Sequence, residues 1–199
     1  MITRKEMTRM LLKEGLLSCL ANNSFESVTV TSLCKASGIT RSTFYLHYSN
    51  IMEIVDDLVD DAIAYSKPGM VDNNNLQTIA QTLSAASNSV SLREAYDSIF
   101  DRLPLCQRII RHKKYLPLFL DEQISEYVLQ RIIGREKDRQ GLVMAEALGV
   151  SFDVGVSVFV FLVHGLYAVN KQYKWSQSDE WLEAQKIIFE LVYRGLQSK

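Results

Sequence analysis

The sequence predicts an all-α fold, and three observations support this prediction. Only 3 of the 199 residues are Pro and 9 are Gly, so few positions break helices. Apolar residues recur three and four positions apart along most of the chain, which is the spacing of one helix face. Helix-capping residues and glycines divide these periodic stretches. The composition, 47% hydrophobic and 23% charged, is ordinary for a globular protein with a packed core.

The first two helices are expected over about residues 3–20 and from residue 30 to Gly38. Asn22, Asn23 and Ser24 end the first. Thr29 is a good N-cap for the second, whose inward stripe is Val30, Leu33 and Cys34. Gly38 supplies a left-handed residue at its C-terminus.

A third, short helix follows the turn at Gly38. Thr40 caps it, and Ile39 and Phe44 have the spacing of a hydrophobic staple, which fixes the direction of the helix. Phe44 and Tyr48, four residues apart, are expected to point inward with Ile39. The side chains expected on the opposite side are Arg41, Ser42, Tyr45 and Leu46.

Residues 29–48 therefore predict a helix-turn-helix, in which the second helix reads the DNA major groove. Arginine can donate two hydrogen bonds to guanine, and apolar groups can meet a thymine methyl. Thr43 and His47 lie at the margins of the exposed face, where they can reach phosphates. Thr31 and Ser32 begin the preceding helix, where free backbone N–H groups can bind a phosphate. The alternative is a purely structural motif, because helical proteins that do not bind DNA also contain two helices joined by a similar turn.

A fourth helix is expected over about residues 51–66, with Asn50 and Glu53 forming a capping box. Residues 66–69 and 72–75 resemble a linker. We place an N-terminal domain at residues 1–50 and a second domain at 51–199, bridged by the fourth helix. Helices expected in the second domain span about 76–90, 92–112, 116–138, 152–174 and 178–197, with breaks at Ser91, 113–115, 141–149 and 176–178.

Charge is distributed unevenly between these parts. Residues 1–50 hold six basic and three acidic side chains, whereas residues 51–66 hold five acidic side chains and no Lys or Arg. A modestly basic head on a neutral or acidic body is typical of a small DNA-binding module carried by a larger regulatory domain.

The three cysteines, Cys19, Cys34 and Cys106, are odd in number and far apart, which favours small buried hydrophobes over disulfides or a redox sensor. No signal peptide is visible, so a cytoplasmic location is expected. The longest apolar run, residues 154–169, is shorter than the roughly 20 residues of a membrane span. It favours one buried helix over a membrane span or two strands.

Residues 38–50, GITRSTFYLHYSN, resemble the N-terminal signature of tetracycline-repressor-like (TetR) regulators. The run from Arg41 to Tyr45 followed by His47 and Tyr48 is similar to a subgroup that includes regulators of dihydroxyacetone kinase genes. The resemblance covers about residues 5–60. It implies a homodimeric, all-helical transcription factor, usually a repressor, with a variable C-terminal effector domain and a dimer bundle formed by the last two helices. By position in the motif, the DNA-facing role falls to Thr40, Arg41, Ser42, Thr43, Tyr45, Leu46 and His47.

One position departs from that family. Ile51 stands where the family commonly has a lysine that meets a phosphate, so one charged anchor to DNA is missing. This departure and the acidic fourth helix leave an alternative open. The chain would then be an interaction protein or co-regulator of the same fold, with weak DNA binding of its own.

The last two helices, about 152–174 and 178–197, are the predicted dimer contact. Small residues that allow close helix approach are Gly155, Ser157, Gly165 and Ala168. A stripe on the final helix comprises Trp181, Ile188, Leu191 and Val192. A monomeric core is the alternative. A twofold dimer suits a palindromic operator, because two recognition helices must lie one DNA turn apart.

A small-molecule effector is expected to bind within the second domain. The candidate lining residues, each of which also suits a plain core, are Tyr96, Phe100, Cys106, Phe119, Phe161, His164 and Tyr167. His164 is the best single candidate, because an imidazole among valines must find a partner. No catalytic, cofactor-binding or metal-binding motif is present, so we expect neither an enzyme nor a cofactor. The sequence thus favours a ligand-responsive, homodimeric transcriptional regulator.

Overall fold

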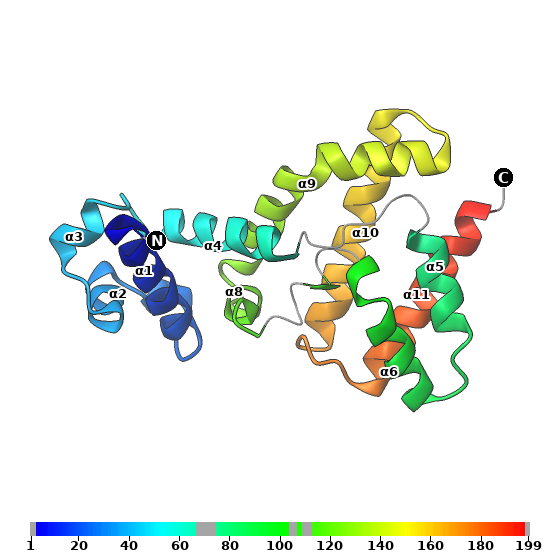
Figure 1. Ribbon diagram of the computed structural model, residues 1–199, viewed down its shortest axis with the longest axis horizontal. Coiled ribbons are helices and arrows are strands. Elements are labelled where there is room, and N and C mark those ends of the chain that lie inside the picture. The colour runs from blue at the N-terminus through cyan, green and yellow to red at the C-terminus, as the bar shows by residue number, and fades with distance from the viewer. Residues whose placement is uncertain (1–2, 67–74, 104–106, 109–112, 198–199) are drawn as a thin grey trace. The chain divides into compact units, whose positions relative to one another are not determined.

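The computed structural model describes residues 3–66, 75–103, 107–108 and 113–197, and every regular element in these ranges is a helix (Figure 1). The all-α prediction is therefore confirmed. The elements of the N-terminal half are α1 (Arg4–Leu20), η1 (Phe25–Ser27), α2 (Val30–Ser37), α3 (Arg41–Tyr45), α4 (Ile51–Ser66), α5 (Asn75–Ser84), α6 (Ser89–Ser98) and η2 (Phe100–Arg102). Those of the C-terminal half are α8 (Leu116–Leu120), α9 (Ser125–Leu148), α10 (Phe152–Gln172) and α11 (Asp179–Gln197).

The chain forms two compact units that differ from a simple division at residue 50. The first unit combines residues 1–65 with 112–134, and the second combines 66–111 with 135–199. Helix α9 contributes its first part to the first unit and the rest to the second. The predicted linker falls almost entirely on residues 67–74, outside the described residues.

The core of the first unit is built from the inward faces of its helices. Its fully buried side chains include Leu12 and Leu16 of α1, Leu33 of α2, Phe44 of α3 and Leu58 of α4. Helix α8 and the first part of α9 complete this core with Tyr115, Leu118, Phe119, Ile124, Val128, Leu129, Ile132 and Ile133. The head therefore uses a segment far along the chain to cover its apolar surface.

The second unit has a core of its own, to which α5, α6, α10 and α11 contribute. Helix α11 packs against α5 and α6, as Figure 1 also shows. The buried members are Ile79, Leu83, Leu92, Tyr96, Ile99, Leu103, Leu166, Trp181, Leu182 and Phe189. Trp181, which the sequence pattern assigned to a dimer stripe, lies instead inside this core with 1% of its surface exposed.

Some predicted helix boundaries are wrong, for reasons the local contacts make plain. Ser91 does not break a helix. It is the third residue of α6, where its backbone N–H donates to Asn88 Oδ1 at 2.9 Å in a capping box. The predicted helix 116–138 is interrupted because the Asp121 carboxylate accepts hydrogen bonds from the N–H groups of Gln123 and Ile124, at 3.0 and 3.2 Å.

Gly141 lies inside α9 rather than in the predicted break at 141–149. At this position the glycine does not end the helix, and its lack of a side chain permits a close crossing with α10. A Cβ at Gly155 would meet the backbone of Gly141 and lie 2.7 Å from the Ala145 nitrogen. Helix α9 ends instead at Leu148 and is followed by Gly149, whose φ of 62° is left-handed.

Helix α10 is long and apolar enough, by length and composition, to cross a membrane. Only 28% of its most apolar 18-residue window is buried, so the expectation that this helix is largely buried does not hold within one copy of the chain. Phe161 is 74% exposed, and Val154 is 47% exposed. A substantial apolar surface of α10 is thus uncovered.

Candidate nucleic-acid interface

Two caps fix the geometry of the segment that joins α2 to α3. The Thr29 hydroxyl accepts a hydrogen bond from the Ser32 N–H at 3.1 Å and starts α2. Gly38 ends α2 with a left-handed φ of 66°, and the Ile39 N–H donates to the Cys34 carbonyl at 3.0 Å. The Thr40 hydroxyl then accepts a hydrogen bond from the Thr43 N–H at 3.2 Å and starts α3. Thr29, Gly38 and Thr40 therefore carry the capping roles that the sequence predicts.

The inner side of α3 is held by aromatic packing. Phe44 is fully buried, and Tyr48 is 3% exposed. The Phe44 ring meets Tyr45 edge-on at 5.1 Å between centroids and lies 6.3 Å from Tyr48. Helix α3 has five residues, too few to be stable alone, so this packing positions it.

The opposite side of α3 is exposed. Arg41 and Ser42 are exposed, Tyr45 retains 53% of its surface, and Leu46, the C-cap residue, retains 81%. A leucine exposed to this degree beside a half-exposed tyrosine and an arginine forms a mixed surface of donors and apolar groups. Such a surface has the chemistry needed to contact base edges.

Hydroxyl groups lie beside this exposed surface, but several already have partners. Thr40 Oγ1 is 3.0 Å from Ser42 Oγ and 2.8 Å from Thr43 Oγ1. Ser32 Oγ donates to the Thr29 carbonyl at 2.9 Å, so Ser32 is a capping residue of α2. Thr31 is exposed. Of the pair predicted at the start of α2, Thr31 is the one whose side chain remains available.

His47 is half-buried, and its Nδ1 atom is buried without a hydrogen-bond partner. Ile51 begins α4 and is also half-buried. Neither side chain is as open as those of Arg41 and Leu46.

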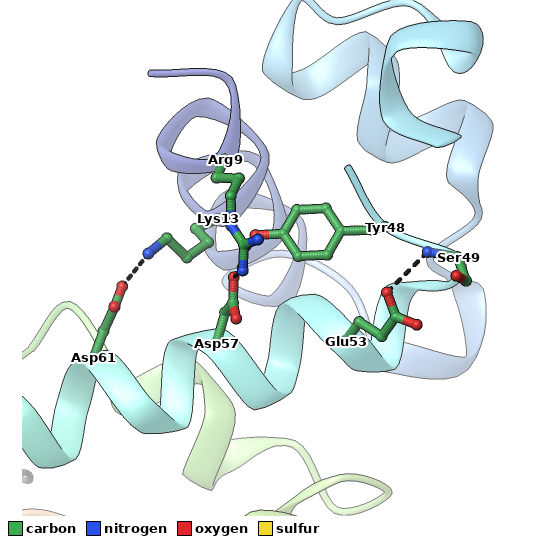
Figure 2. A network of polar contacts seen from close by, with 7 residues as sticks. All are labelled: Arg9, Lys13, Tyr48, Ser49, Glu53, Asp57 and Asp61. Carbon is green, nitrogen blue, oxygen red and sulfur yellow. Dashed lines mark hydrogen bonds and ion pairs between the residues drawn. The ribbon is translucent and has the colours of Figure 1, made fainter. Parts of the chain in front are cut away.

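A network of polar contacts ties α1 and the segment that follows α3 to α4 (Figure 2). The Arg9 guanidinium pairs with Asp57 and lies 4.9 Å from the centre of the Tyr48 ring. Lys13 pairs with Asp61. The Tyr48 hydroxyl donates to Asp57 Oδ2 at 2.5 Å. Basic residues of α1 are therefore used inside the head to neutralise acidic residues of α4.

This environment raises the pKa of two groups, which keeps Tyr48 neutral and Arg9 charged. Burial, followed by the hydrogen bond to Asp57, raises the pKa of Tyr48 well above its usual value. The hydrogen bond to Asp57 raises the pKa of Arg9, which keeps the guanidinium charged. Tyr48 therefore remains a neutral hydrogen-bond donor that supports α3 from beneath.

The segment 112–134 makes further contacts with the head, which the sequence analysis did not predict. The carboxylate of Asp121 accepts a hydrogen bond from the Phe25 N–H at 2.6 Å, and Gln123 donates to Glu26 at 2.8 Å. On α4, Asp56 accepts from the Tyr127 hydroxyl at 2.6 Å. Pairings so distant in sequence leave no local pattern by which they can be recognised.

Six of the seven predicted effector-binding residues are described, and they do not share one core. Tyr96 and Tyr167 are buried in the second unit, and Phe100 packs against its core, whereas His164 is half-buried. Phe119 belongs to the core of the first unit, and Phe161 is exposed. Cys106 lies outside the described residues. Within the described residues, no group of three or more His, Cys, Asp or Glu side chains is arranged to hold a metal ion.

Comparison of the chain with models of known protein families, with curated proteins and with solved structures finds no match.

Proposed function

We propose that this chain is a DNA-binding transcriptional regulator of TetR type, with α2 and α3 forming a helix-turn-helix. The observation that carries the proposal is the exposed face of α3, where Arg41, Tyr45 and Leu46 project from an element anchored by buried Phe44. Exposing such side chains on a rigidly anchored helix gives no benefit to folding. It does provide the groups that major-groove recognition uses.

The proposed roles follow from the chemistry of each side chain. Arg41 donates two hydrogen bonds to a guanine, and Leu46 meets a thymine methyl. The exposed hydroxyls of Thr31 and Ser42 contact phosphates, which fix the register of α3 without reading the sequence. Arg4, Lys5 and Lys35 are exposed and add positive charge to the head.

We further propose that the protein acts as a homodimer through α10 and α11. The residues of α10 at positions 154, 158, 161, 165 and 168 are all apolar, have coiled-coil spacing, and are exposed or half-exposed. Helix α11 leaves Ile187 and Leu191 exposed, by 51% and 65%. A second copy of the chain covers these apolar surfaces and provides the second recognition helix for a palindromic operator.

In this proposal the regulator is a repressor that a small-molecule effector releases or modulates from the second unit. An effector shifts operator affinity only by its differential binding to the two conformations of the dimer. Helix α9 contributes its first part to the first unit and the rest to the second.

The alternative is a co-regulator of the same fold whose own DNA binding is weak. The observation that favours it is Ile51, which begins α4 without the positive charge of a phosphate-binding lysine. The acidic residues of α4 give it less support, because Asp57 and Asp61 are paired with Arg9 and Lys13.

Selection from a pool of randomised DNA duplexes tests the proposal and separates the two candidates. The purified chain is expected to enrich an inverted repeat whose half-sites lie about one helical turn, or 34 Å, apart. Its binding to the enriched duplex is then measured at about 50 and about 200 mM salt against a scrambled duplex. Weak binding that is equal on both duplexes would favour the co-regulator.

A further inference from the structure

The core of the second unit contains a cluster of polar side chains that folding alone does not explain. We call it the buried polar cluster. Three of its side chains, Gln107, Asn170 and Gln185, are 0% exposed, and Tyr96 and Trp181 are 2% and 1% exposed. The residues come from α6, α10, α11 and the described positions 107–108. Uncharged polar groups are thus gathered where the surrounding core is apolar.

Hydrogen bonds and ring contacts connect the five side chains. The Trp181 indole N–H donates to Asn170 Oδ1 at 2.9 Å. The Tyr96 ring meets the Trp181 ring edge-on at 5.2 Å, and its hydroxyl donates to Gln107 Oε1 at 3.3 Å. The Gln107 amide in turn donates to Gln185 Oε1 at 3.0 Å. The cluster is therefore one connected arrangement.

Two amide groups of this arrangement are left without partners. Asn170 Nδ2 and Gln185 Nε2 are both buried and make no hydrogen bond to the residues that the structure describes. The orientation of Asn170 is fixed, because an indole N–H can only donate and therefore selects the amide oxygen. The two glutamines can be reversed together, in which case Gln185 presents an unpartnered oxygen instead. Asn170 is the defined donor of the cluster.

Leaving a buried amide unpaired destabilises a fold, whereas an apolar side chain of similar shape at the same place does not. We infer that the buried polar cluster binds a small uncharged molecule that carries a carbonyl oxygen. The carbonyl accepts a hydrogen bond from Asn170 Nδ2, and Gln185, whose amide can present either end, pairs with a second polar group. The molecule is uncharged because the five side chains of the cluster bring no charge that could neutralise one.

As the site of an effector, the cluster rests on the proposed function. Whether the cluster binds a small molecule at all does not depend on the proposed function, so this binding is tested in the absence of DNA. The probes are cyclopentanone and 2-pyrrolidinone, which carry a carbonyl oxygen, and methylenecyclopentane, which has the shape of cyclopentanone but lacks the oxygen. Each is titrated into the full-length ¹⁵N-labelled protein, and the Trp181 indole and Asn170 amide signals are followed by NMR. The chain has 2 Trp, so Trp175→Phe assigns the Trp181 signal.

We expect at least one carbonyl probe to shift both signals saturably, and methylenecyclopentane to bind about tenfold more weakly than cyclopentanone. Asn170→Leu is expected to abolish carbonyl binding. Because that variant also removes the partner of Trp181, the double variant Gln107→Leu/Gln185→Met serves as a second test. Removing both glutamines together leaves neither amide unpaired by the other, although the Tyr96 hydroxyl loses its acceptor on Gln107. The variant is therefore expected to fold with a somewhat lower stability than the original chain and to bind 2-pyrrolidinone about tenfold more weakly.

The inference fails if neither carbonyl probe gives a saturable shift at Trp181 and Asn170. It also fails if cyclopentanone and methylenecyclopentane bind equally, or if the double variant folds and binds 2-pyrrolidinone unchanged. None of these outcomes depends on whether the protein binds DNA. A failure of the cluster is therefore distinguishable from a failure of the proposed function.

Discussion

At the scale of single residues, Arg41 and Tyr48 lie seven positions apart and have different roles, an exposed one and a supporting one. Arg41 is exposed on α3, whereas Tyr48 is buried beneath it and bonded to Asp57. A substitution at Arg41 therefore tests recognition with little effect on folding. A substitution at Tyr48 tests the support of α3 without altering the outward face.

Arg41→Ala is expected to weaken binding to the selected duplex by about 5- to 150-fold for each half-site, because a bidentate arginine–guanine contact contributes about 1–3 kcal/mol. It should also relax the base preference at one position of each half-site. Fluorescence anisotropy on matched and mismatched duplexes measures both effects. Arg102→Ala, an exposed arginine of the second unit, is the charge-matched control. Unchanged affinity in Arg41→Ala would show that α3 is not the reading element.

Tyr48→Phe is expected to lower the free energy of unfolding by about 1–2 kcal/mol, because it removes the hydrogen bond to the Asp57 carboxylate and keeps the ring. The same contact makes stability depend on pH. Since the pKa of Tyr48 is raised in the folded protein, its unfolded form releases the proton first, above the usual value of about 10. The contribution of Tyr48 is therefore complete below about pH 10 and declines as the pH rises further.

Urea unfolding at about pH 8 and about pH 10.5 measures this difference. The original chain should lose more stability between the two pH values than Tyr48→Phe does. Tyr45→Phe, at a half-exposed tyrosine three residues earlier, provides the comparison for a hydroxyl that Asp57 does not hold. Equal pH dependence in the original chain and Tyr48→Phe would contradict the assignment.

At the scale of elements, the crossing of α9 and α10 depends on the absence of side chains. Gly141 and Gly155 bring the two backbones so close that a Cβ on either has no room. Gly134, on the same helix as Gly141, has nothing within 4 Å of the position of a Cβ. Two glycines of one helix thus have opposite structural requirements.

Gly155→Ala is expected to lower the free energy of unfolding by about 1–3 kcal/mol, because overpacking forces the two helices apart. Gly134→Ala should instead raise it by about 0.5–1 kcal/mol, since alanine favours a helix and meets nothing there. Chemical denaturation of both variants gives the two values. A Gly155→Ala protein as stable as Gly134→Ala would mean that the helices do not cross so closely.

At the scale of the whole molecule, the main feature is the uncovered apolar surface of α10 and α11. One copy buries 28% of the most apolar window of α10. A large exposed apolar surface on a folded protein marks an interaction site. We propose that its partner is a second copy, because the exposed positions of α10 follow the spacing of helix–helix packing.

Sedimentation analysis is expected to give twice the 22.7 kDa mass of the chain, and Phe161→Glu combined with Leu191→Glu should reduce it to one copy. In a dimer the new carboxylates would be removed from water without a partner. This desolvation cost adds to the lost apolar packing, and both favour the separated copies. Val90→Glu, at a residue 68% exposed on α6, is expected to leave the mass unchanged. A monomer in the original chain, or a protein that stays soluble only in detergent, would rule out the dimer.

The sequence by itself determines the local features of this protein. Helical periodicity and capping residues such as Thr29, Gly38 and Thr40 act through neighbours in the chain, so they identify α1 to α4 and the outward residues of α3. Only the tertiary structure decides that residues 112–134 join the head, that Trp181 enters the core and that Gly141 continues a helix. These outcomes depend on contacts between segments far apart in the chain, whose free energies no local pattern records.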